Sequence, residues 1–257
     1  MLNYRNINIL FAGLFFAGLI AWLAGVMQVY LFMILGLVYL LFIGYGCYNV
    51  GSNFFIPIIC SLKTAKKVVA ISFDDGPNAE NTPQILQMLK DADVSAAFFF
   101  IGNHIPANEA VVKQAYEDGH LISNHTFSHH FWFDLFSAEK MLADMHMMDQ
   151  EVYRVIGKVP KLFRPPYGVT NPNLSKAIVR GNYIPVGWNI RSLDTMIKNE
   201  RKLFDKVVSN LRPGAVFLFH DTSAATVAIL PVLMQHIKSH GYEILRLDKM
   251  LNLPAYA

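Results

Sequence analysis

Hydrophobic residues dominate the first fifth of this 257-residue chain and then give way to short apolar runs that alternate with amphipathic segments. Residues 7–24 and 29–46 are apolar and uncharged, and each stretch is close to the ~17-residue lower limit for a membrane-spanning helix. One helix through both would be about 60 Å long, twice the thickness of the hydrocarbon layer. A cleaved signal peptide fits less well, because the apolar region is too long and no small-x-small cleavage site follows it. The pattern predicts a membrane anchor over residues 1–50 with two transmembrane helices.

Charged residues mark the flanks of this predicted hairpin and are absent from its turn. The flanking basic residues are Arg5, Lys63, Lys66 and Lys67. Under the positive-inside rule, this bias favours a protein of the cell membrane whose C-terminal domain lies in the cytoplasm. Residues 51–66 form a juxtamembrane segment with a short apolar stretch around Pro57. This segment either lies at the membrane surface or joins the following domain as an edge element.

From residue 67 onward, runs of β-branched and aromatic residues alternate with segments of helical periodicity, which is typical of βα units and a parallel sheet or barrel. Strands are predicted at residues 67–73, 96–101, 120–124, 163–167, 183–188, 215–220 and 242–247. Helices are predicted at residues 82–93, 106–118, 137–156, 172–180, 200–211 and 226–240. Because no linker or repeat interrupts the pattern, we expect residues 67–251 to form one domain.

Overall charge and cysteine content exclude some functions. Without Arg5 the chain has 21 Lys and Arg against 19 Asp and Glu, so there is no electrostatic reason to expect a nucleic-acid partner. Cys47 and Cys60 are too few for a disulfide framework and lack the spacing of metal ligands. We expect them to be ordinary buried thiols.

Two adjacent acids end the first predicted strand of the domain. Asp74 and Asp75 are followed by Gly76-Pro77, which predicts a turn. Neighbouring side chains of a strand point to opposite faces, so both acids can serve one site only if the chain is already turning. Taken alone, the stretch fits an ordinary turn better than a site.

A pair of histidines follows the predicted strand at residues 120–124. His125 and His129 are four residues apart, so on a helical backbone they would aim at one point, whereas His130 would point away. With one carboxylate they would form an open three-ligand site suited to Zn²⁺ or a similar divalent ion, which lowers the pKa of a bound water towards ~7. Taken alone, the pair is more typical of surface or capping histidines.

Two more stretches place polar residues beside predicted strands. Arg164 precedes two prolines, whose stiff backbone suits an arginine that holds a carboxylate. Leu218 and His220 are two residues apart at the end of a buried strand, so they share a face. Taken alone, the Arg164 stretch fits a proline-rich loop with a solvated arginine better than a site, and a satisfied core histidine is the alternative for His220.

In this order and spacing, the stretches resemble the polysaccharide deacetylases with the NodB homology domain, carbohydrate esterase family 4, over residues 67–251. The matching blocks are Ser72–Pro77, His125–His129, Arg164–Tyr167, a partial block from Trp188 to Asp194, and Leu218–His220. The resemblance implies an α/β fold with a distorted (β/α) barrel of about seven strands. It also implies a divalent metal ion, with zinc favoured, and removal of N-acetyl groups from amino sugars.

The resemblance also implies a role for each matching residue. These are Asp75, His125 and His129 as metal ligands, Asp74 as general base, His220 as general acid, Arg164 as the partner of Asp74, the Tyr167 N–H as oxyanion donor, and Trp188, Leu218 and Asp194 at the substrate pocket. The residue types agree with amide hydrolysis, which needs an activated water, a stabilised oxyanion and a proton for the departing amine.

The fourth block departs from the family pattern. Arg191 stands where the family has its first aspartate, and Thr195 stands where it has a tryptophan. That aspartate is thought to tune the catalytic histidine, so a nearby Arg191 is expected to lower the pKa of His220. Asp194 is a possible substitute by position, whereas Asp221 is expected to point to the other face of the strand.

These observations favour a membrane-anchored, metal-dependent hydrolase that removes N-acetyl groups from amino sugars of a cell-envelope glycan or its lipid-linked precursor. The expected partners are therefore an N-acetylated glycan or lipid-linked amino sugar and the membrane, without nucleic acid. The alternative is a carbohydrate-binding protein of the same fold that is catalytically weak or inactive because its fourth block has changed.

Overall fold

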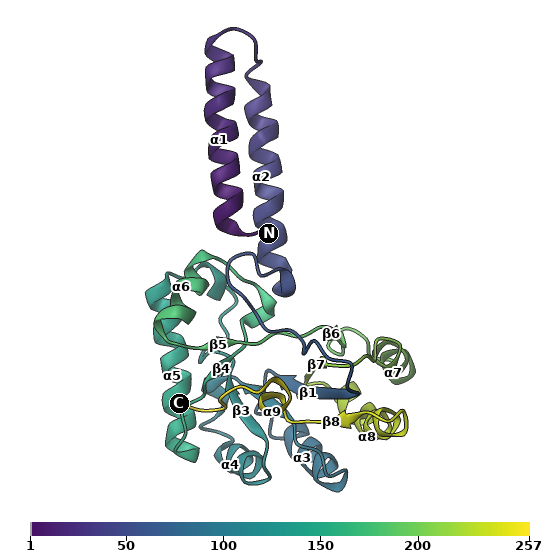
Figure 1. The fold of residues 1–257 in the computed structure, drawn as a ribbon. Helices are drawn as coiled ribbons and strands as arrows, with labels where there is room; N and C mark the ends of the chain where they lie inside the picture. Colours follow the sequence, from purple (N-terminus) through teal and green to yellow (C-terminus); the bar gives the residue numbers. More distant parts are fainter. Residues whose placement is uncertain (1) are drawn as a thin grey trace.

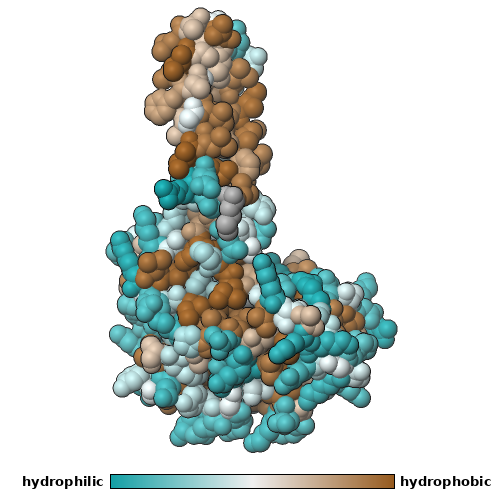
Figure 2. All heavy atoms as spheres, in the orientation of Figure 1, coloured by the Kyte–Doolittle hydropathy of each residue, from teal (hydrophilic) through white to brown (hydrophobic). Residues whose placement is uncertain are grey.

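The structure, a computed structural model, describes residues 2–257 and consists of a long helical hairpin attached to an α/β domain (Figure 1). Helices α1 (Tyr4–Leu23) and α2 (Tyr30–Tyr48) are both long and apolar enough to cross a membrane. The surface of the hairpin is largely hydrophobic, whereas the domain has a mixed surface (Figure 2). The two apolar helices predicted from the sequence are therefore present, with ends that differ by one to three residues.

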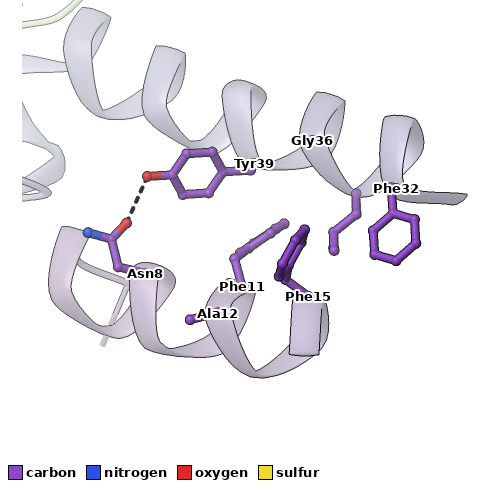
Figure 3. Close-up of a pocket in the computed structure, with 8 residues that line it drawn as sticks. Asn8, Phe11, Ala12, Phe15, Phe32, Gly36 and Tyr39 are labelled. Atoms are coloured by element: carbon purple, nitrogen blue, oxygen red, sulfur yellow. Dashed lines mark hydrogen bonds between the residues drawn. The ribbon is translucent and has the colours of Figure 1, made fainter. Parts of the chain in front are cut away.

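The two helices of the hairpin face each other through aromatic side chains and one polar pair, Asn8 and Tyr39 (Figure 3). A cavity of about 440 Å³ lies between them and is lined by Phe11, Phe15 and Phe32, among others. At one end of it the Tyr39 hydroxyl donates a hydrogen bond of 2.8 Å to Asn8 Oδ1. A hydrogen bond between apolar helices pairs two groups that would be costly to leave unsatisfied in a lipid environment, so it fixes how α1 faces α2.

The domain is a curled parallel sheet with helices on its outer side (Figure 1). Across residues 2–257 the strands are β1 (Val68–Asp74), β2 (Ala97–Phe100), β3 (Leu121–Asn124), β4 (Leu162–Phe163), β5 (Ile184–Pro185), β6 (Ile190–Arg191), β7 (Ala215–His220) and β8 (Glu243–Ile244). They follow the order β5-β4-β3-β2-β1-β7-β6, with β8 beside β1, and every pair is parallel. The expected distorted barrel is confirmed, and β8, the last strand predicted from the sequence, pairs with β1 outside the main strand order.

Helices follow most strands along the chain, as expected for βα units. They are α3 (Asn81–Asp91), α4 (Glu109–Glu117), α5 (Ala138–Ile156), α6 (Pro172–Arg180), α7 (Glu200–Val208), α8 (Ala224–Ser239) and α9 (Leu247–Leu251). The short helix α9 differs from the others, because Leu247 and Met250 pack in one cluster with Val68 and Ala70 of β1. The inner side of the curled sheet is therefore filled at one end by the C-terminal segment.

Alternation along β1 determines which side chains reach the inside of the curled sheet. Ile71 and Phe73 belong to the larger hydrophobic cluster with the outer helices, whereas Ala70 belongs to the inner cluster. Ser72 and Asp74 continue the inner face, because side chains of a strand alternate. In β7, His220 takes the inner face by the same alternation and pairs in register with Asp74. The two central strands thus bring an acid and a histidine together at their carboxyl ends.

Three predicted strands are reduced to two residues each, for local reasons. The strand predicted at residues 163–167 ends at Phe163, because Pro165 and Pro166 have no N–H to donate to a neighbouring strand. The strand predicted at residues 183–188 is only β5, and a further short strand that was not predicted, β6, follows Trp188 and lies at the opposite edge of the sheet. The last predicted strand is only Glu243–Ile244, since α9 begins at Leu247.

The juxtamembrane segment joins the domain, which is one of the two alternatives that the sequence left open. Ile59 pairs with Val186 next to β5, and Ser61 pairs with Ala215 of β7. At the end of α2, the buried Thr170 donates from Oγ1 to the Gly46 carbonyl at 2.9 Å and from its N–H to the Cys47 carbonyl at 3.1 Å. These contacts connect the last turn of the hairpin directly to the domain.

Replacement of Thr170 by valine tests this connection. The Thr170→Val variant keeps the shape of the side chain and the backbone N–H but loses the hydroxyl donor to Gly46. We expect the free energy of unfolding to fall by about 1 kcal/mol, as measured by denaturant unfolding of the full chain in detergent. Thr222→Val is the matched control, because Thr222 is exposed; an equal loss in both variants would contradict the role of Thr170.

Candidate active site

A cavity of about 190 Å³ opens at the carboxyl ends of β1 and β7. It is lined by Asp74, Asp75, His125, His129, Pro165, Tyr167, Gly168, Trp188, Arg191, Thr195, Leu218 and His220. The set includes eight of the ten site residues expected from the sequence. The other two, Arg164 and Asp194, are fully buried, and each contacts a residue that lines the cavity. The structure therefore gathers all ten residues in one place.

The chain turns between the two adjacent acids, as the sequence argument requires. Asp74 continues the inner face of β1, whereas Asp75 has a φ of 76°, in the left-handed region that such residues rarely adopt. Gly76 then packs against the carboxyl group of Asp221, which leaves no space for a Cβ atom. A residue held in the left-handed region costs about 1–3 kcal/mol and is common where function needs it. This turn allows both carboxylates to face one cavity.

The two histidines converge although they lie in a loop. The helical backbone that the sequence suggested between them was therefore wrong. Thr126 and His129 have positive φ values of 69° and 42°. The loop is bent because Asp144 Oδ1 on α5 accepts hydrogen bonds from the N–H groups of Phe127 and Ser128, at 2.7 and 3.1 Å. Sequence reasoning missed Asp144. One sequence feature could have indicated it, because Asp144 is an acidic residue on the same helical face as the buried Met141, Met145 and Met148.

Hydrogen bonds and charges orient the imidazoles. His125 Nδ1 lies 2.9 Å from the Arg164 carbonyl, which leaves Nε2 facing the cavity. Burial opposes protonation of His125, but the carboxylates of Asp74 and Asp75 outweigh it and raise the pKa of His125. Burial and the neighbouring His125 lower the pKa of His129 to about 4. At neutral pH His129 is therefore an uncharged imidazole with a free lone pair.

Asp75 lies between the two histidines. Its Oδ1 atom is 3.5 Å from Nε2 of His125 and 3.5 Å from Nε2 of His129. Burial alone would raise the pKa of Asp75, but the hydrogen bond and charge of His125, with His220 and His129, lower it well below its usual range. The ligand atoms of the three residues all lie within 4.8 Å of one another. Tetrahedral N and O ligands of a zinc ion are about 3.3 Å apart, so this group could hold a divalent metal ion.

Arg164 is the largest fully buried side chain of the domain. One of its terminal nitrogens donates to Asp74 Oδ1 at 2.6 Å and to Ser72 Oγ at 2.9 Å. Its other donors reach the carbonyls of Val186 and Gly187, and the guanidinium stacks 3.9 Å from the Phe99 ring centroid. A buried charge needs such full pairing. Arg164 thereby fixes one carboxylate oxygen of Asp74, while Oδ2 lies 3.9 Å from His125 Nε2.

Asp194, and not Arg191, contacts His220. Its Oδ1 atom is 2.7 Å from His220 Nδ1, and its Oδ2 atom accepts from the His220 N–H at 2.7 Å. Burial opposes protonation of His220, but the hydrogen bond and charge of Asp194 raise the pKa of His220 to about 8. The expectation that Arg191 lowers this pKa was therefore wrong. Asp194 was also expected at the substrate pocket, but it lies behind His220 and does not line the cavity.

Asp221 points away from the cavity, as the strand alternation predicts. It is fully buried beside Gly76, where its Oδ2 atom accepts a hydrogen bond of 2.6 Å from Thr82 Oγ1. Burial, with the nearby charges of Asp75 and Asp74, raises the pKa of Asp221 to about 7. The side chain acts on the site indirectly, since it packs under the turn that follows the two acids.

The rim of the cavity is aromatic. Tyr167 has a φ of 58° and a side chain that is 49% exposed, with its ring 4.8 Å from His129 and 6.5 Å from the exposed Phe131. Gly168, at a φ of 73°, lies so close to Trp188 that a Cβ atom would collide with the indole. Exposed aromatic rings beside a polar cavity provide flat apolar surfaces for a ligand.

Comparison with known proteins gives consistent matches for the domain. The model of the family described as polysaccharide deacetylase matches residues 61–184. The peptidoglycan-N-acetylglucosamine deacetylase PgdA of Listeria monocytogenes is 30% identical over 196 residues, which are 76% of this chain and 41% of that protein. A peptidoglycan-N-acetylglucosamine deacetylase of Bacillus cereus is 31% identical over 191 residues, which are 72% of this chain and 89% of that protein. This chain thus spans less than half the length of the Listeria relative.

A solved structure supports the same relationship in three dimensions. The Bc1960 peptidoglycan N-acetylglucosamine deacetylase, in complex with 4-naphthalen-1-yl-N-oxidanyl-benzamide, superimposes with a TM-score of 0.74. It is 28% identical, and the match covers 78% of this chain and 95% of that chain. The curled parallel sheet is therefore shared with this protein.

Proposed function

We propose that this chain, which belongs to the polysaccharide deacetylase family, hydrolyses the N-acetyl group of amino sugars in a cell-envelope glycan or its lipid-linked precursor. The observation that carries the proposal is the cavity at the ends of β1 and β7, where two carboxylates, three histidines and a carboxylate-bound arginine converge. The named activities of the Listeria and Bacillus relatives on peptidoglycan N-acetylglucosamine support the same class of reaction.

The proposed cofactor is a divalent metal ion, with zinc favoured. Asp75, His125 and His129 would hold it, because their ligand atoms are mutually close and His125 presents Nε2 to the cavity. One carboxylate with two imidazoles is a ligand set that suits zinc and leaves a free position. When bound, such an ion would lower the pKa of a water molecule and polarise the acetyl carbonyl.

The proton transfers, the stabilisation of the oxyanion and the binding of the acetyl methyl group are assigned to side chains and a backbone N–H of the cavity. Asp74 Oδ2, left free by the pairing of Oδ1 with Arg164, would take the proton of the attacking water. The N–H of Tyr167, a residue that lines the cavity, would stabilise the oxyanion. His220, oriented by Asp194, would give its proton to the departing amine nitrogen. Leu218 and Trp188 would enclose the acetyl methyl group.

The proposed location is the cell membrane, with α1 and α2 as two spans. Arg5 lies in the first turn of α1, and Lys63, Lys66 and Lys67 lie in the segment between α2 and β1, whereas the turn between the two helices is uncharged. This asymmetry favours a cytoplasmic domain. A reporter fused to the C-terminus would test the assignment, because an alkaline phosphatase fusion is active only outside the cytoplasm and a fluorescent-protein fusion reports the opposite side.

Acetate release tests the proposed activity. We expect the full chain in detergent to release acetate from N-acetylglucosamine oligomers or lipid-linked N-acetyl amino sugars, to lose this activity on treatment with a chelator, and to regain it with added Zn²⁺. Intact sugar binding without acetate release from a broad panel, with metal supplied, would favour the alternative, a binding protein of the same fold.

A further inference from the structure

A second cavity adjoins the site and extends to the hairpin. Its volume is about 530 Å³, and its lining consists of Tyr48, Asn49, Val50, Gly51, Cys60, Trp188, Asn189 and Arg191. Trp188 and Arg191 also line the site cavity. The first four residues belong to the end of α2 and the short 3-10 turn after it, where the hairpin meets the domain (Figure 1). We name this second cavity the hairpin groove.

We propose that the hairpin groove binds the phosphate or diphosphate of a lipid-linked amino sugar, and that Arg191 is the residue that recognises it. This inference rests on the proposed deacetylation and specifies its substrate class. The substrate would be a 2-acetamido sugar whose carbon 1 is joined through the phosphate group to a membrane lipid.

Arg191 is an exposed cation without a carboxylate partner. Its guanidinium carbon lies 5.8 Å from the Trp188 ring centroid, and no Asp or Glu forms an ion pair with it anywhere in residues 2–257. None of the eight residues that line the groove is acidic. An arginine guanidinium matches phosphate oxygens with two parallel N–H donors. The groove therefore has positive charge that an anionic ligand would neutralise.

The amide side chains of the groove add further donors. Asn49 Oδ1 accepts from the Gly51 N–H at 3.2 Å, and Asn189 Oδ1 accepts from the Val216 N–H at 2.9 Å. Because the oxygen of each amide is engaged by backbone, the group that remains is the Nδ2 donor. Donors and a cation without any acid are the composition expected for an anion site.

The order of the two cavities matches the chemistry of such a substrate. In a 2-acetamido sugar the amide is on carbon 2 and the phosphate is on the neighbouring carbon 1, so the two groups must be recognised side by side. Arg191 lies at the junction of the two cavities, next to the pocket of Trp188 and Leu218 proposed for the acetyl group. The lipid would then continue from the groove towards the hairpin.

The walls of the groove are already fixed by protein contacts. Gly187 donates to the Ile59 carbonyl at 3.0 Å and packs closely against Cys60, Ile58 and Val50. Thr170 is also bound to the last turn of α2, which leads into the groove. A preformed groove binds its ligand without the cost of ordering loops.

The test compares a lipid-linked with a neutral substrate. The full chain in detergent micelles is given N-acetylglucosamine joined by diphosphate to a farnesyl chain, or tri-N-acetylchitotriose. Arg191→Gln is expected to raise the KM for the farnesyl substrate about 10- to 100-fold. This increase should be at least tenfold larger than the increase for the neutral oligomer. Arg191→Lys should recover part of the lost affinity for the farnesyl substrate. Arg201→Gln is the matched control, since Arg201 is exposed on α7 and pairs with Asp205.

Two results separate failure of this inference from failure of the proposed function. An equal effect of Arg191→Gln on both substrates, or no effect on either, overturns the role of the groove. If the unmodified chain releases acetate from neither substrate, the proposed activity fails. In that case, the inference is tested separately by the affinity for a fluorescent farnesyl diphosphate sugar. Weaker binding by Arg191→Gln than by the unmodified chain would support the inference, and equal affinity would overturn it.

Discussion

Replacement of Asp74 by asparagine is expected to lower kcat/KM about 10³-fold while the protein still binds its metal ion. The geometry gives the two acids different roles. Asp75 Oδ1 is 3.5 Å from Nε2 of both His125 and His129, whereas Asp74 Oδ1 accepts a hydrogen bond from Arg164. Asparagine keeps the shape of Asp74 but cannot accept a proton from water. The measurements are acetate release and metal content after dialysis.

The adjacent Asp75→Asn variant is the matched control, since it makes the same chemical change one residue away. We expect it to lower metal affinity strongly, as we expect for His125→Ala, because both remove a proposed ligand. Retained metal in Asp74→Asn also shows that the variant is folded, despite the buried Arg164 that it leaves without a charged partner. If Asp74→Asn lost metal and Asp75→Asn retained it, the roles of the two acids would be reversed.

The parts of the fold that the sequence predicted well are those with long hydrophobic patterns. β1 and β7 were placed within one residue of their observed ends, because β1 has seven and β7 has five consecutive residues buried in the sheet. Strands β5 and β6 contain two residues each, which is too short for any periodicity to appear. Their positions are set by pairing with β4 and β7 and by the juxtamembrane segment, which are tertiary contacts.

Site residues at strand ends could be predicted from strand alternation, whereas Asp194 could be suggested only by its position in the fourth block and its contact with His220 could not be derived. Asp74 and His220 follow from strand alternation and from the parallel register of β1 and β7. Asp194 faces His220 because Leu193 has a φ of 63°, in the left-handed region. Leucine gives no sequence signal for that conformation, which glycine would have given. The turn is stabilised instead by two hydrogen bonds. Ser223, just before α8, donates to the Asp194 carbonyl, and Thr226, on α8, donates to Asp194 Oδ2.

Replacement of Asp194 by asparagine is expected to reduce kcat about 10²- to 10³-fold at pH 7.5 and to change the pH profile. The carboxylate of Asp194 is the main group that raises the pKa of His220 to about 8. Without that charge the imidazolium is less stable, so the pKa of His220 falls. A general acid must be protonated to act, and activity is therefore lost as pH rises through its pKa. The alkaline limb of kcat/KM should move to lower pH in Asp194→Asn.

Thr226→Val provides a graded comparison, because it removes one hydrogen bond to Asp194 Oδ2 and leaves the carboxylate in place. We expect little shift of the alkaline limb in this variant, since the charge of Asp194, which raises the pKa of His220, stays next to the imidazole. The profile also discriminates between mechanisms. If kcat fell equally at every pH in Asp194→Asn, with the alkaline limb unchanged, Asp194 would act only by positioning the loop, and the proton donor would have to be a group other than His220.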